Sequence, residues 1–321
     1  MRRKKSKNHF FRNAILLLMV CACVGLFYAY RKEKAAHPEE SWQDAAQKTI
    51  TETVEKGKEL APETKEGDEK EKKTTDQTGG TKKKPASPST NESDWLPGLS
   101  KRQYKGKLAV VIDDCGYDMD ALRTLTHLPL PMSFAIIPFK THSRDALQEI
   151  RNQGRVAMLH LPMEPMNGGS SEAEAVKVGM TKEQIQRFTQ KAIDSLPGIQ
   201  GVNNHQGSRA TSNGPTITAA LSTMKQNGLF FVDSRTASTS VAEEKAAALG
   251  MRTGHNSLFL DNSADEETIR RQIGKAIALA NQYGSVIVIC HARPHTAAAW
   301  KKSIAAIQAT GIRLVPVTDV L

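Results

Sequence analysis

The sequence predicts an α/β fold in which a parallel sheet closes into a barrel, or nearly so. From Lys101 onward, apolar runs of four to seven residues alternate with segments of helical periodicity, which is the pattern of successive β-then-α units. Seven or eight such units fit into about 220 residues, which is close to the usual size of a (β/α) barrel. An open, doubly wound sheet would show the same alternation, so periodicity alone leaves both topologies open.

The predicted strands are short, apolar and rich in β-branched residues. In chain order they are Leu108–Ile112, Met132–Ile137, Val156–Leu161, the neighbours of Val202, Leu229–Val232, Ser257–Leu260, Ser285–Cys290 and Ile312–Val317. The helices expected between them are Asp118–Leu128, His142–Gln153, Thr181–Leu196, Pro215–Asn227, Val241–Leu249, Asp265–Tyr283 and His295–Thr310. Three helices begin with a capping-box spacing, in which each side chain can satisfy the other's free backbone N–H: Thr181 with Gln184, Ser240 with Glu243, and Ser263 with Glu266.

Residues 1–30 are expected to form a basic segment followed by a transmembrane signal anchor. Residues 1–13 are strongly basic, and Ala14 to Tyr30 is an uncharged, mostly apolar run of 17 residues. A basic flank stays on the cytoplasmic side, so the chain after Tyr30 is expected outside. No small-x-small cleavage site precedes Arg31, which favours a retained anchor over a cleaved signal or a lipid-modified Cys21 or Cys23.

Residues 31–100 have the composition of a disordered, charged linker, and residues 101–321 carry the folded domain. Lys, Glu, Thr and Ser dominate the linker, which has few apolar residues to bury. The net charge is +10, but six basic residues lie within residues 1–30 and the rest are too dispersed for a nucleic-acid site. We therefore expect no nucleic-acid partner, and a membrane-anchored protein whose domain is extracytoplasmic, in the periplasm or at the cell surface.

Polar side chains follow nearly every predicted strand at its carboxyl end. In chain order they are Asp113 and Asp114, His160, then Asn203, Asn204 and His205, then Asp233, Asp261 and His291. In a (β/α) barrel, the carboxyl ends of the strands open into the loops that carry functional residues. We therefore expect these side chains to build one site at that end.

The residue types in this set predict metal-assisted hydrolysis. One Asp with two imidazoles suits zinc or a similar divalent metal and leaves a coordination position open. A second Asp beside the ligand cannot readily face the same ion, but it can take a proton from water. A further His across the barrel could protonate a leaving group, so the set fits hydrolysis of an amide or ester.

The motifs VIDDCGYD, LHLPMEP, NNHQGSRAT, FFVDSRT, LFLD and VICHARPHT, in this order across residues 107–321, resemble the divergent polysaccharide deacetylase family. The resemblance implies a distorted (β/α) barrel of about seven strands, of the NodB-homology type. In the wider superfamily it implies removal of N-acetyl or O-acetyl groups from polysaccharide. It also implies that Asp113 is the catalytic base, Asp114 a metal ligand and His291 the catalytic acid.

The remaining metal ligands follow less directly from the resemblance. Active members of the superfamily carry a second metal-binding His about four residues after the first, where this chain has Glu164 after His160. We expect His205 as the third ligand beside Asp114 and His160, because the fourth strand should lie next to the third. Glu164, an oxygen donor of suitable reach, remains the alternative.

Five further residues are candidates for orienting the ligands or binding substrate. Asp233 and Asp261 are suited either to orienting an imidazole or to holding a loop N–H. Arg235 and Arg293 are expected either to bind an anionic substrate group or to pair with these acids. Asn204, at the end of the fourth strand, belongs to the same group.

Cys115 and Cys290 each adjoin an expected site residue, on the first and last strands of the closed ring. Those strands are neighbours in a closed barrel, so a disulfide is geometrically feasible. Adjacent residues of a strand point to opposite faces, however, so we expect two buried free thiols that face away from the site.

The sequence therefore predicts a metal-dependent, deacetylase-like hydrolase that acts on carbon–nitrogen bonds other than peptide bonds, with zinc as the expected metal. Its expected substrate is the polysaccharide of an acetylated cell-envelope glycan. Because the second histidine is missing, an inactive deacetylase-like domain serving as a glycan-binding or scaffold module remains the alternative. A metal phosphohydrolase is less favoured, because no glycine-rich phosphate cradle is evident. The sequence makes no prediction about oligomeric state.

Overall fold

The computed structural model describes residues 104–169 and 172–321. The predicted anchor, residues 1–30, and the predicted linker, residues 31–100, lie outside the described residues. Within the described ranges, no helix has both the length and the apolar character needed to cross a membrane.

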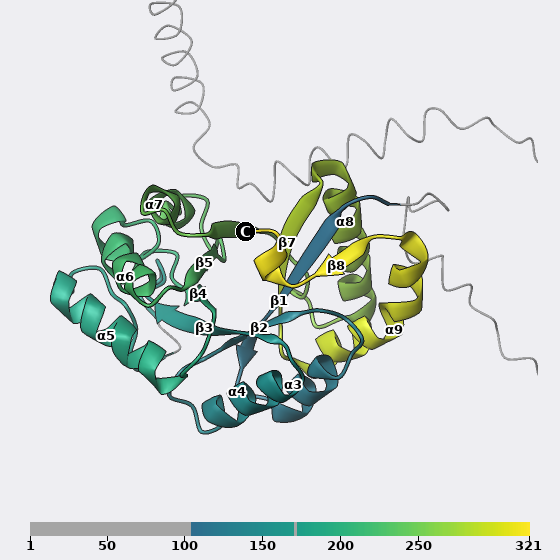
Figure 1. Ribbon diagram of the computed structural model, residues 1–321, viewed down its shortest axis with the longest axis horizontal. Helices are drawn as coiled ribbons and strands as arrows, with labels where there is room; N and C mark the ends of the chain where they lie inside the picture. Colours follow the sequence, from purple (N-terminus) through teal and green to yellow (C-terminus); the bar gives the residue numbers. More distant parts are fainter. Residues whose placement is uncertain (1–103, 170–171) are drawn as a thin grey trace, which may run out of the picture. The chain divides into compact units, whose positions relative to one another are not determined.

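Strands and helices alternate through the described residues in the predicted order (Figure 1). The strands are β1 (Lys107–Cys115), β2 (Ser133–Ile136), β3 (Val156–Met163), β4 (Gly201–Gln206), β5 (Phe230–Asp233), β6 (Thr253–Phe259), β7 (Ser285–His291) and β8 (Arg313–Val315). The helices are α3 (Met119–Thr126), α4 (Ser143–Asn152), α5 (Lys182–Ser195), α6 (Gly214–Gln226), α7 (Ala242–Ala248), α8 (Glu266–Tyr283) and α9 (Pro294–Thr310), with a 3₁₀ turn η1 (Val317–Asp319).

Strands β1 to β7 form a closed ring of seven parallel strands. Each strand pairs with the next in the sequence, and β7 pairs along nearly the whole of β1, from Lys107 opposite Ser285 to Asp113 opposite His291. On the other edge of β1, β8 pairs with its amino end and β2 with its carboxyl end. The predicted barrel is therefore confirmed, and the open doubly wound alternative is wrong.

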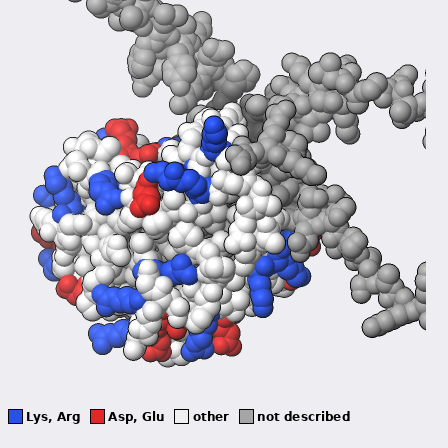
Figure 2. All heavy atoms as spheres, turned by 45° about the vertical axis from the view of Figure 1, so that its right-hand side comes forward, with Lys and Arg blue, Asp and Glu red and all other residues white. Residues whose placement is uncertain are grey.

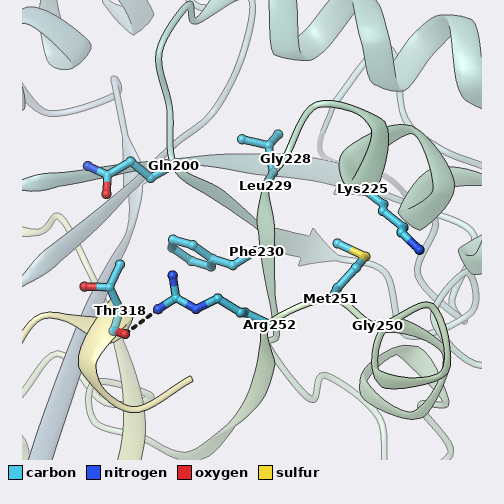
Figure 3. A pocket seen from close by; sticks show the side chains of 9 residues that line it. All are labelled: Gln200, Lys225, Gly228, Leu229, Phe230, Gly250, Met251, Arg252 and Thr318. Atoms are coloured by element: carbon cyan, nitrogen blue, oxygen red, sulfur yellow. Dashed lines mark hydrogen bonds between the residues drawn. The ribbon is translucent and has the colours of Figure 1, made fainter.

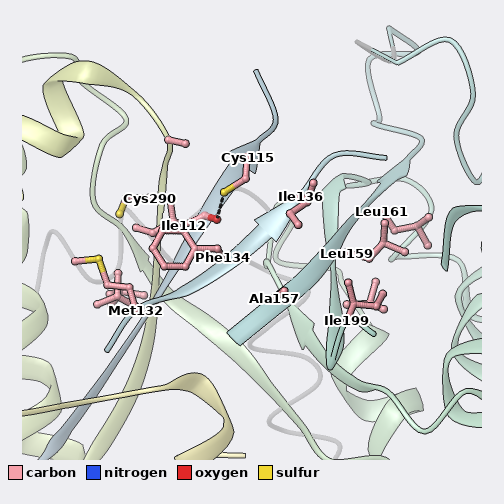
Figure 4. Packing of buried hydrophobic residues seen from close by; sticks show 14 of the residues in the cluster. Ile112, Cys115, Met132, Phe134, Ile136, Ala157, Leu159, Leu161, Ile199 and Cys290 are labelled. Carbon is pink, nitrogen blue, oxygen red and sulfur yellow. Dashed lines mark hydrogen bonds between the residues drawn. The ribbon is translucent and has the colours of Figure 1, made fainter. Parts of the chain in front are cut away.

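The period-two alternation of the strands sorts their side chains into an inner and an outer apolar layer. The inner layer includes Ala109, Val111, Met158, Val232 and Ile289. The outer layer, which packs under the helices, includes the residues drawn in Figure 4, among them Ile112, Phe134, Leu159 and Leu161. The same alternation continues to the strand ends and decides which polar side chains point into the barrel.

Gly201 lets an aromatic ring fill the barrel interior below the strand ends. A Cβ atom at Gly201 would lie 2.2 Å from the ring of Phe230, so any other residue would displace that ring. Phe230 is buried in the inner layer together with Val232 of the same strand. The ring packs beneath the level of Asn203, which faces the same side of β4 as Gly201.

One of the three predicted capping boxes forms. Thr181 Oγ1 accepts from the Gln184 N–H, and Gln184 Oε1 accepts from the Thr181 N–H. At Ser240 the prediction is wrong, because its hydroxyl donates to a buried carboxylate of β5. Before α8 it is also wrong, because Asp265 and not Ser263 is the N-cap: a carboxylate closer to the helix accepts from the first turn.

The two cysteines of the barrel are buried free thiols, as predicted, and they form no disulfide. The Cys115 thiol donates to the Ile112 carbonyl at 3.3 Å (Figure 4), and Trp300 Nε1 donates to Cys290 Sγ at 3.4 Å. Burial raises the pKa of both thiols well above the ordinary value. Both are outer-layer residues, so neither sulfur lies on the face that carries the candidate site.

Charged side chains are dispersed over one face of the folded part. Figure 2 shows one face, on which Lys and Arg are interspersed with Asp and Glu among uncharged residues. Over the described residues of that face, the positive charges do not join into one continuous strip.

Candidate functional site

Two adjacent acids enter one site because the backbone changes conformation between them. Asp113 follows Ala109 and Val111 on the inward face of β1 and is 1% exposed. A regular strand would turn Asp114 outward, but Asp114 has a left-handed backbone with φ of 60°, and the β1–β2 register slips at this point. Its carboxylate therefore reaches the same end of the barrel as that of Asp113.

Asp114, His160 and His205, from β1, β3 and β4, bring three potential ligand atoms together. Asp114 Oδ1 lies 3.6 Å from His160 Nε2 and 3.3 Å from His205 Nδ1. The three atoms all lie within 4.8 Å of one another, and the two imidazole rings meet edge to face at 4.8 Å between centroids. This is the only such group of three His, Cys, Asp or Glu residues that the described part of the chain contains.

The donor set fits a divalent metal ion. Asp114 Oδ1 is buried and receives no hydrogen bond, although a carboxylate oxygen left in this way costs about 1–3 kcal/mol or more. A cation between this oxygen and the two imidazole nitrogens would remove that cost. One carboxylate and two imidazoles are also ligands that zinc accepts.

Asn203 sets the orientation of both His160 and Asp113. Its Nδ2 donates to Asp113 Oδ1 at 2.8 Å, so its Oδ1 faces the His160 ring and accepts from Nδ1, also at 2.8 Å. All three side chains are almost fully buried. With the proton on Nδ1, His160 presents the lone pair of Nε2 to Asp114 Oδ1, which is the form in which an imidazole binds metal.

Burial and neighbouring charges keep these groups in states suited to ligation. Burial, reinforced by the adjacent His205, lowers the pKa of His160 to about 3, so the imidazole is neutral. Burial would raise the pKa of Asp114, but the neighbouring His205 and His160 hold it below its ordinary value. At Asp113, burial prevails and raises the pKa well above the ordinary value for Asp.

A third imidazole stands on β7, where His291 pairs in register with Asp113 of the neighbouring β1. His291 Nδ1 lies 2.8 Å from Asp261 Oδ1, and Asp261 Oδ2 accepts from the His291 backbone N–H and from Thr296 Oγ1. Burial opposes protonation, but the Asp261 carboxylate raises the pKa of His291 above its ordinary value. The ring of Phe259 lies nearly parallel to that of His291, with centroids 6.3 Å apart.

Glu164 is not part of the group of three possible ligands. Its Oε2 accepts from the Val178 N–H at 2.7 Å, and its Oε1 accepts from Arg209 Nη1 at 2.9 Å. Its backbone carbonyl accepts from the N–H groups of Arg209 and Ala210. Glu164 thus ties the loop after β3 to the loop after β4, and the structure brings His205 to Asp114 in its place.

Of the other candidates, Asp261 and Arg293 lie at the site and three do not. Arg293 Nη2 is 3.8 Å from Asp114 Oδ2 and its side chain is half exposed. Asp233 accepts from the Arg235 N–H and the Ser240 hydroxyl, so it holds a loop. Arg235 pairs with Glu243 at 2.8 Å. Asn204 faces outward and bonds the Ser234 N–H and the Gln206 carbonyl, which makes it a loop contact as well.

Sequence reasoning placed Asn203 among the strand-end residues without giving it a role of its own, and it missed Thr296. Asn203 could have been found from the period of the strand, because residues 203 and 205 of β4 share a face and Asn204 must point the other way. Thr296 carries no comparable signal, because it lies in the first turn of α9 and reaches Asp261 through the tertiary fold.

A surface hollow at the opposite end of the barrel is unconnected with this site. It has a volume of about 240 Å³ and is lined by residues such as Gln200, Phe230 and Met251, near the amino ends of β4 to β6 (Figure 3). Its two cations, Lys225 and Arg252, each donate to a backbone carbonyl, of Leu249 and Thr318 respectively. Both charged side chains of the hollow are thus engaged in contacts with the backbone, and no described residue that lines it is acidic or a histidine.

Residues 110–321 match the family model described as divergent polysaccharide deacetylase. The chain belongs to this family. An uncharacterized protein of Haemophilus influenzae is 36% identical over 212 residues, which cover 66% of this chain and 73% of that protein. The uncharacterized protein YibQ of Escherichia coli is 34% identical over 201 residues, and the match spans 63% of each chain.

The deacetylase-like fold is also found in a solved structure. An uncharacterized protein of Agrobacterium tumefaciens C58 superposes with a TM-score of 0.64 at 18% identity, covering 71% of this chain and 95% of that one. At this identity the likeness concerns the fold. In this member of the divergent polysaccharide deacetylase family, the strand ends combine three residues that could hold a metal ion, a buried carboxyl group and a carboxylate-paired imidazole. Such a set can bind a cation, accept a proton and donate a proton.

Proposed function

We propose that this protein is a metal-dependent deacetylase that removes acetyl groups from a cell-envelope glycan by hydrolysing an acetamido carbon–nitrogen bond. One observation carries the proposal: the Asp114, His160 and His205 group and the separate His291–Asp261 pair lie at the same end of one barrel. Membership of the divergent polysaccharide deacetylase family supports the reaction class.

In this proposal, Asp114 Oδ1, His160 Nε2 and His205 Nδ1 hold a divalent metal ion, with zinc the first candidate. When bound, the ion supplies Lewis-acid chemistry at the acetyl carbonyl and makes water more acidic. Asn203 keeps His160 in the tautomer that leaves Nε2 unprotonated. A metal-bound imidazole is a neutral ligand, so of the three proposed ligands only the Asp114 carboxylate would offset part of the positive charge of the ion.

Asp113 is the proposed base. It is fixed by Asn203 Nδ2 at 2.8 Å, and its Oδ2 lies 3.5 Å from His160 Nε2, beside the proposed ligands without joining them. A carboxylate held there can accept the proton that the attacking water loses. Because burial raises its pKa, Asp113 retains that proton more readily than an exposed carboxylate would.

His291 is the proposed acid. The Asp261 carboxylate favours its protonated form, and the backbone N–H and Thr296 bonds hold that carboxylate in place. A protonated imidazole on β7, the strand next to β1, can donate to the leaving nitrogen, or to an oxygen if the acetyl group is an ester. Arg293, half exposed beside Asp114, is a proposed contact for an anionic or polar substrate group.

The proposal extends to the place of the reaction. Residues 1–30 would act as a transmembrane signal anchor and residues 31–100 as a tether, so that the domain works outside the cytoplasm. An envelope glycan would then be within reach of the domain. Protease accessibility of the domain in intact and in permeabilised cells tests this part separately.

Acetate release from acetylated glycans tests the activity. The full chain, purified in detergent, is assayed before and after treatment with a chelator, and again after zinc is restored. The proposal expects release that stops with the chelator and returns with zinc. Acetate release that is unchanged by the chelator would contradict metal dependence. A lack of acetate release from every acetylated glycan would contradict the activity.

An inactive glycan-binding or scaffold module is the second candidate function. One observation favours it: Glu164, which stands where active superfamily members have a second His, is engaged by Arg209 and Val178. Glycan binding without acetate release, in protein shown to contain metal, would support this candidate over the deacetylase.

A further inference from the structure

Exposed aromatic side chains gather on the loops beside the candidate site. In the described part of the chain, the large apolar residues that remain exposed are Tyr117, Phe139, Met166 and Tyr283. The first three lie on the loops that follow β1, β2 and β3, whereas Tyr283 ends α8 at the opposite end of the barrel. Exposed apolar groups that cluster next to a polar site mark an interaction surface.

Phe139 is held in an unfavourable backbone conformation that keeps its ring at the surface. Its φ is 64°, a region that bulky residues rarely adopt, yet its side chain is 44% exposed. The ring rests against Phe188 at 6.2 Å between centroids, and Lys191 Nζ lies 4.9 Å from its centre. Backbone strain of this kind is concentrated at functional sites.

Tyr117 is fixed in relation to the proposed metal ligand. Its backbone N–H donates to the Asp114 carbonyl, three residues earlier, and its hydroxyl donates to Glu172. Lys140, the neighbour of Phe139, pairs with the other oxygen of Glu172 at 2.5 Å and lies 5.2 Å from the centre of the Tyr117 ring. The two aromatic loops are thereby joined through one buried carboxylate.

We propose that Tyr117 and Phe139 form an aromatic ledge that binds a pyranose ring one or more sugars away from the acetylated residue at the metal site. The C–H face of a pyranose is apolar and packs on an aromatic ring, while its hydroxyl groups need polar partners at the edge. Lys140, whose side chain is partly exposed and which the buried Glu172 holds in place, supplies such a partner beside the Tyr117 ring. The inference rests on the proposed function only for the chemical class of the ligand.

The ledge should give the protein a higher affinity for glycans of several sugar units than for single sugars. Binding energy gained on a remote sugar can position the acetyl group at the metal site. A glycan of several units would therefore bind more tightly than its monomer, and the gain would depend on Tyr117 and Phe139. Met166, on the loop after β3, extends the same exposed rim.

Binding of β-1,4-linked N-acetylglucosamine monomer, dimer and hexamer to the full chain, measured by calorimetry in the presence of chelator, tests the ledge. The unsubstituted protein is expected to bind the hexamer at least about tenfold more tightly than the monomer. Tyr117→Ala and Phe139→Asn should each remove most of this difference. Asn is chosen at 139 because it tolerates a left-handed backbone, so the variant should keep the thermal stability of the parent.

Tyr283→Ala is the matched control, because it removes an even more exposed aromatic ring from the far end of the barrel. It should leave the length dependence unchanged. Equal binding of monomer and hexamer by the unsubstituted protein, or an equal loss in Tyr283→Ala, would overturn the ledge. Ledge-dependent binding without acetate release on restoring zinc would leave the ledge standing and contradict the deacetylase activity instead.

Discussion

His160 and His291 both follow a buried strand at the same end of the barrel, yet their surroundings drive their protonation in opposite directions. Burial lowers the pKa of His160 to about 3, whereas the pKa of His291 is raised although burial acts against it. The two rings differ in the partner of Nδ1. His160 faces the amide oxygen of Asn203 and His291 faces the carboxylate of Asp261, each at 2.8 Å.

The comparison shows that the partner on the far ring nitrogen assigns the task of the imidazole. An amide oxygen fixes the tautomer without adding charge, so a buried ring stays neutral and keeps a lone pair for a metal. A carboxylate fixes the tautomer and also stabilises the charged form, so the ring becomes a proton donor. The β1–β3–β4 side of the site is thereby suited to hold a cation, and the β6–β7 side to deliver a proton.

The largest expected effect comes from removing the Asp114 carboxylate, which lies between the two imidazoles on the β1–β3–β4 side of the site. Asp114→Asn keeps the size of the side chain and tolerates the left-handed backbone at this position. We expect zinc affinity to fall by about 100-fold or more, beyond the 10–100-fold typical of partners outside the ligand set. Zinc content after dialysis, with circular dichroism to verify the fold, measures the effect. Unchanged zinc content would contradict the assignment of Asp114 as a ligand.

Removing the His291 imidazole from the β6–β7 side should lower the catalytic rate without affecting metal binding. His291→Gln is expected to lower kcat by about 10²–10⁴-fold, the usual contribution of a general acid, and to leave zinc content unchanged. Acetate release and metal analysis on the same preparation measure both quantities. A parallel loss of zinc would mean that His291 acts on the metal side of the site, and the division into two halves would fail.

Much of this site can be predicted from the sequence, because several of its residues are the first polar side chains after an apolar run. Asp113, His160 and His291 are all of this kind, and the strands that carry them are buried enough to be recognised. Parallel strands closed in a ring place such residues at one end. The barrel itself follows from the same alternation of strands and helices.

The parts that sequence reasoning misses depend on direction and on long-range contacts. Choosing Asn203 over Asn204 requires knowing which face of β4 points inward. The strand period gives that answer only once His205 is taken to face the site, and the fold bears it out because Val202 is buried in the outer layer. Asp114 joins the site through a left-handed backbone that its sequence neighbours do not reveal. The sharing of one edge of β1 by β2 and β8 depends on pairing between residues far apart in the chain.

Replacing Asn203, the Nδ1 partner of His160, should make His160 a poorer metal ligand. Asn203→Leu removes the acceptor at Nδ1 and the donor to Asp113, and we expect zinc affinity to fall by about 10–100-fold. Asn203→Asp restores an acceptor at Nδ1 but places a carboxylate beside Asp113, so it should recover less than full affinity. Competition with a chromophoric chelator measures the three affinities. Asn204→Leu is the matched control, because Asn204 faces outward.

The smallest expected effect concerns the partner of His291. In metal-free protein, Asp261→Asn should lower the pKa of His291, because it removes the carboxylate that opposes the effect of burial most strongly and leaves only the weaker effects of Asp113 and Asp114. The raised pKa in the parent stabilises the fold below the unfolded-state pKa of about 6.5, and this contribution is lost as the pH rises through the folded-state value. Histidine NMR titration gives the direction of the pKa change.

The same variant should reverse the slope of stability against pH around neutrality. With the folded-state pKa below about 6.5, the unfolded state of Asp261→Asn binds more protons, so its stability rises with pH where the parent's falls. At pH values where the parent pair is charged, we expect the variant to lose about 1.5–3 kcal/mol of unfolding free energy, the usual worth of a hydrogen bond to a charged group. Urea unfolding from mildly acidic to mildly alkaline pH measures both. If the two slopes have the same sign, then the carboxylate does not set the charge of His291, and the contrast with His160 must come from burial alone.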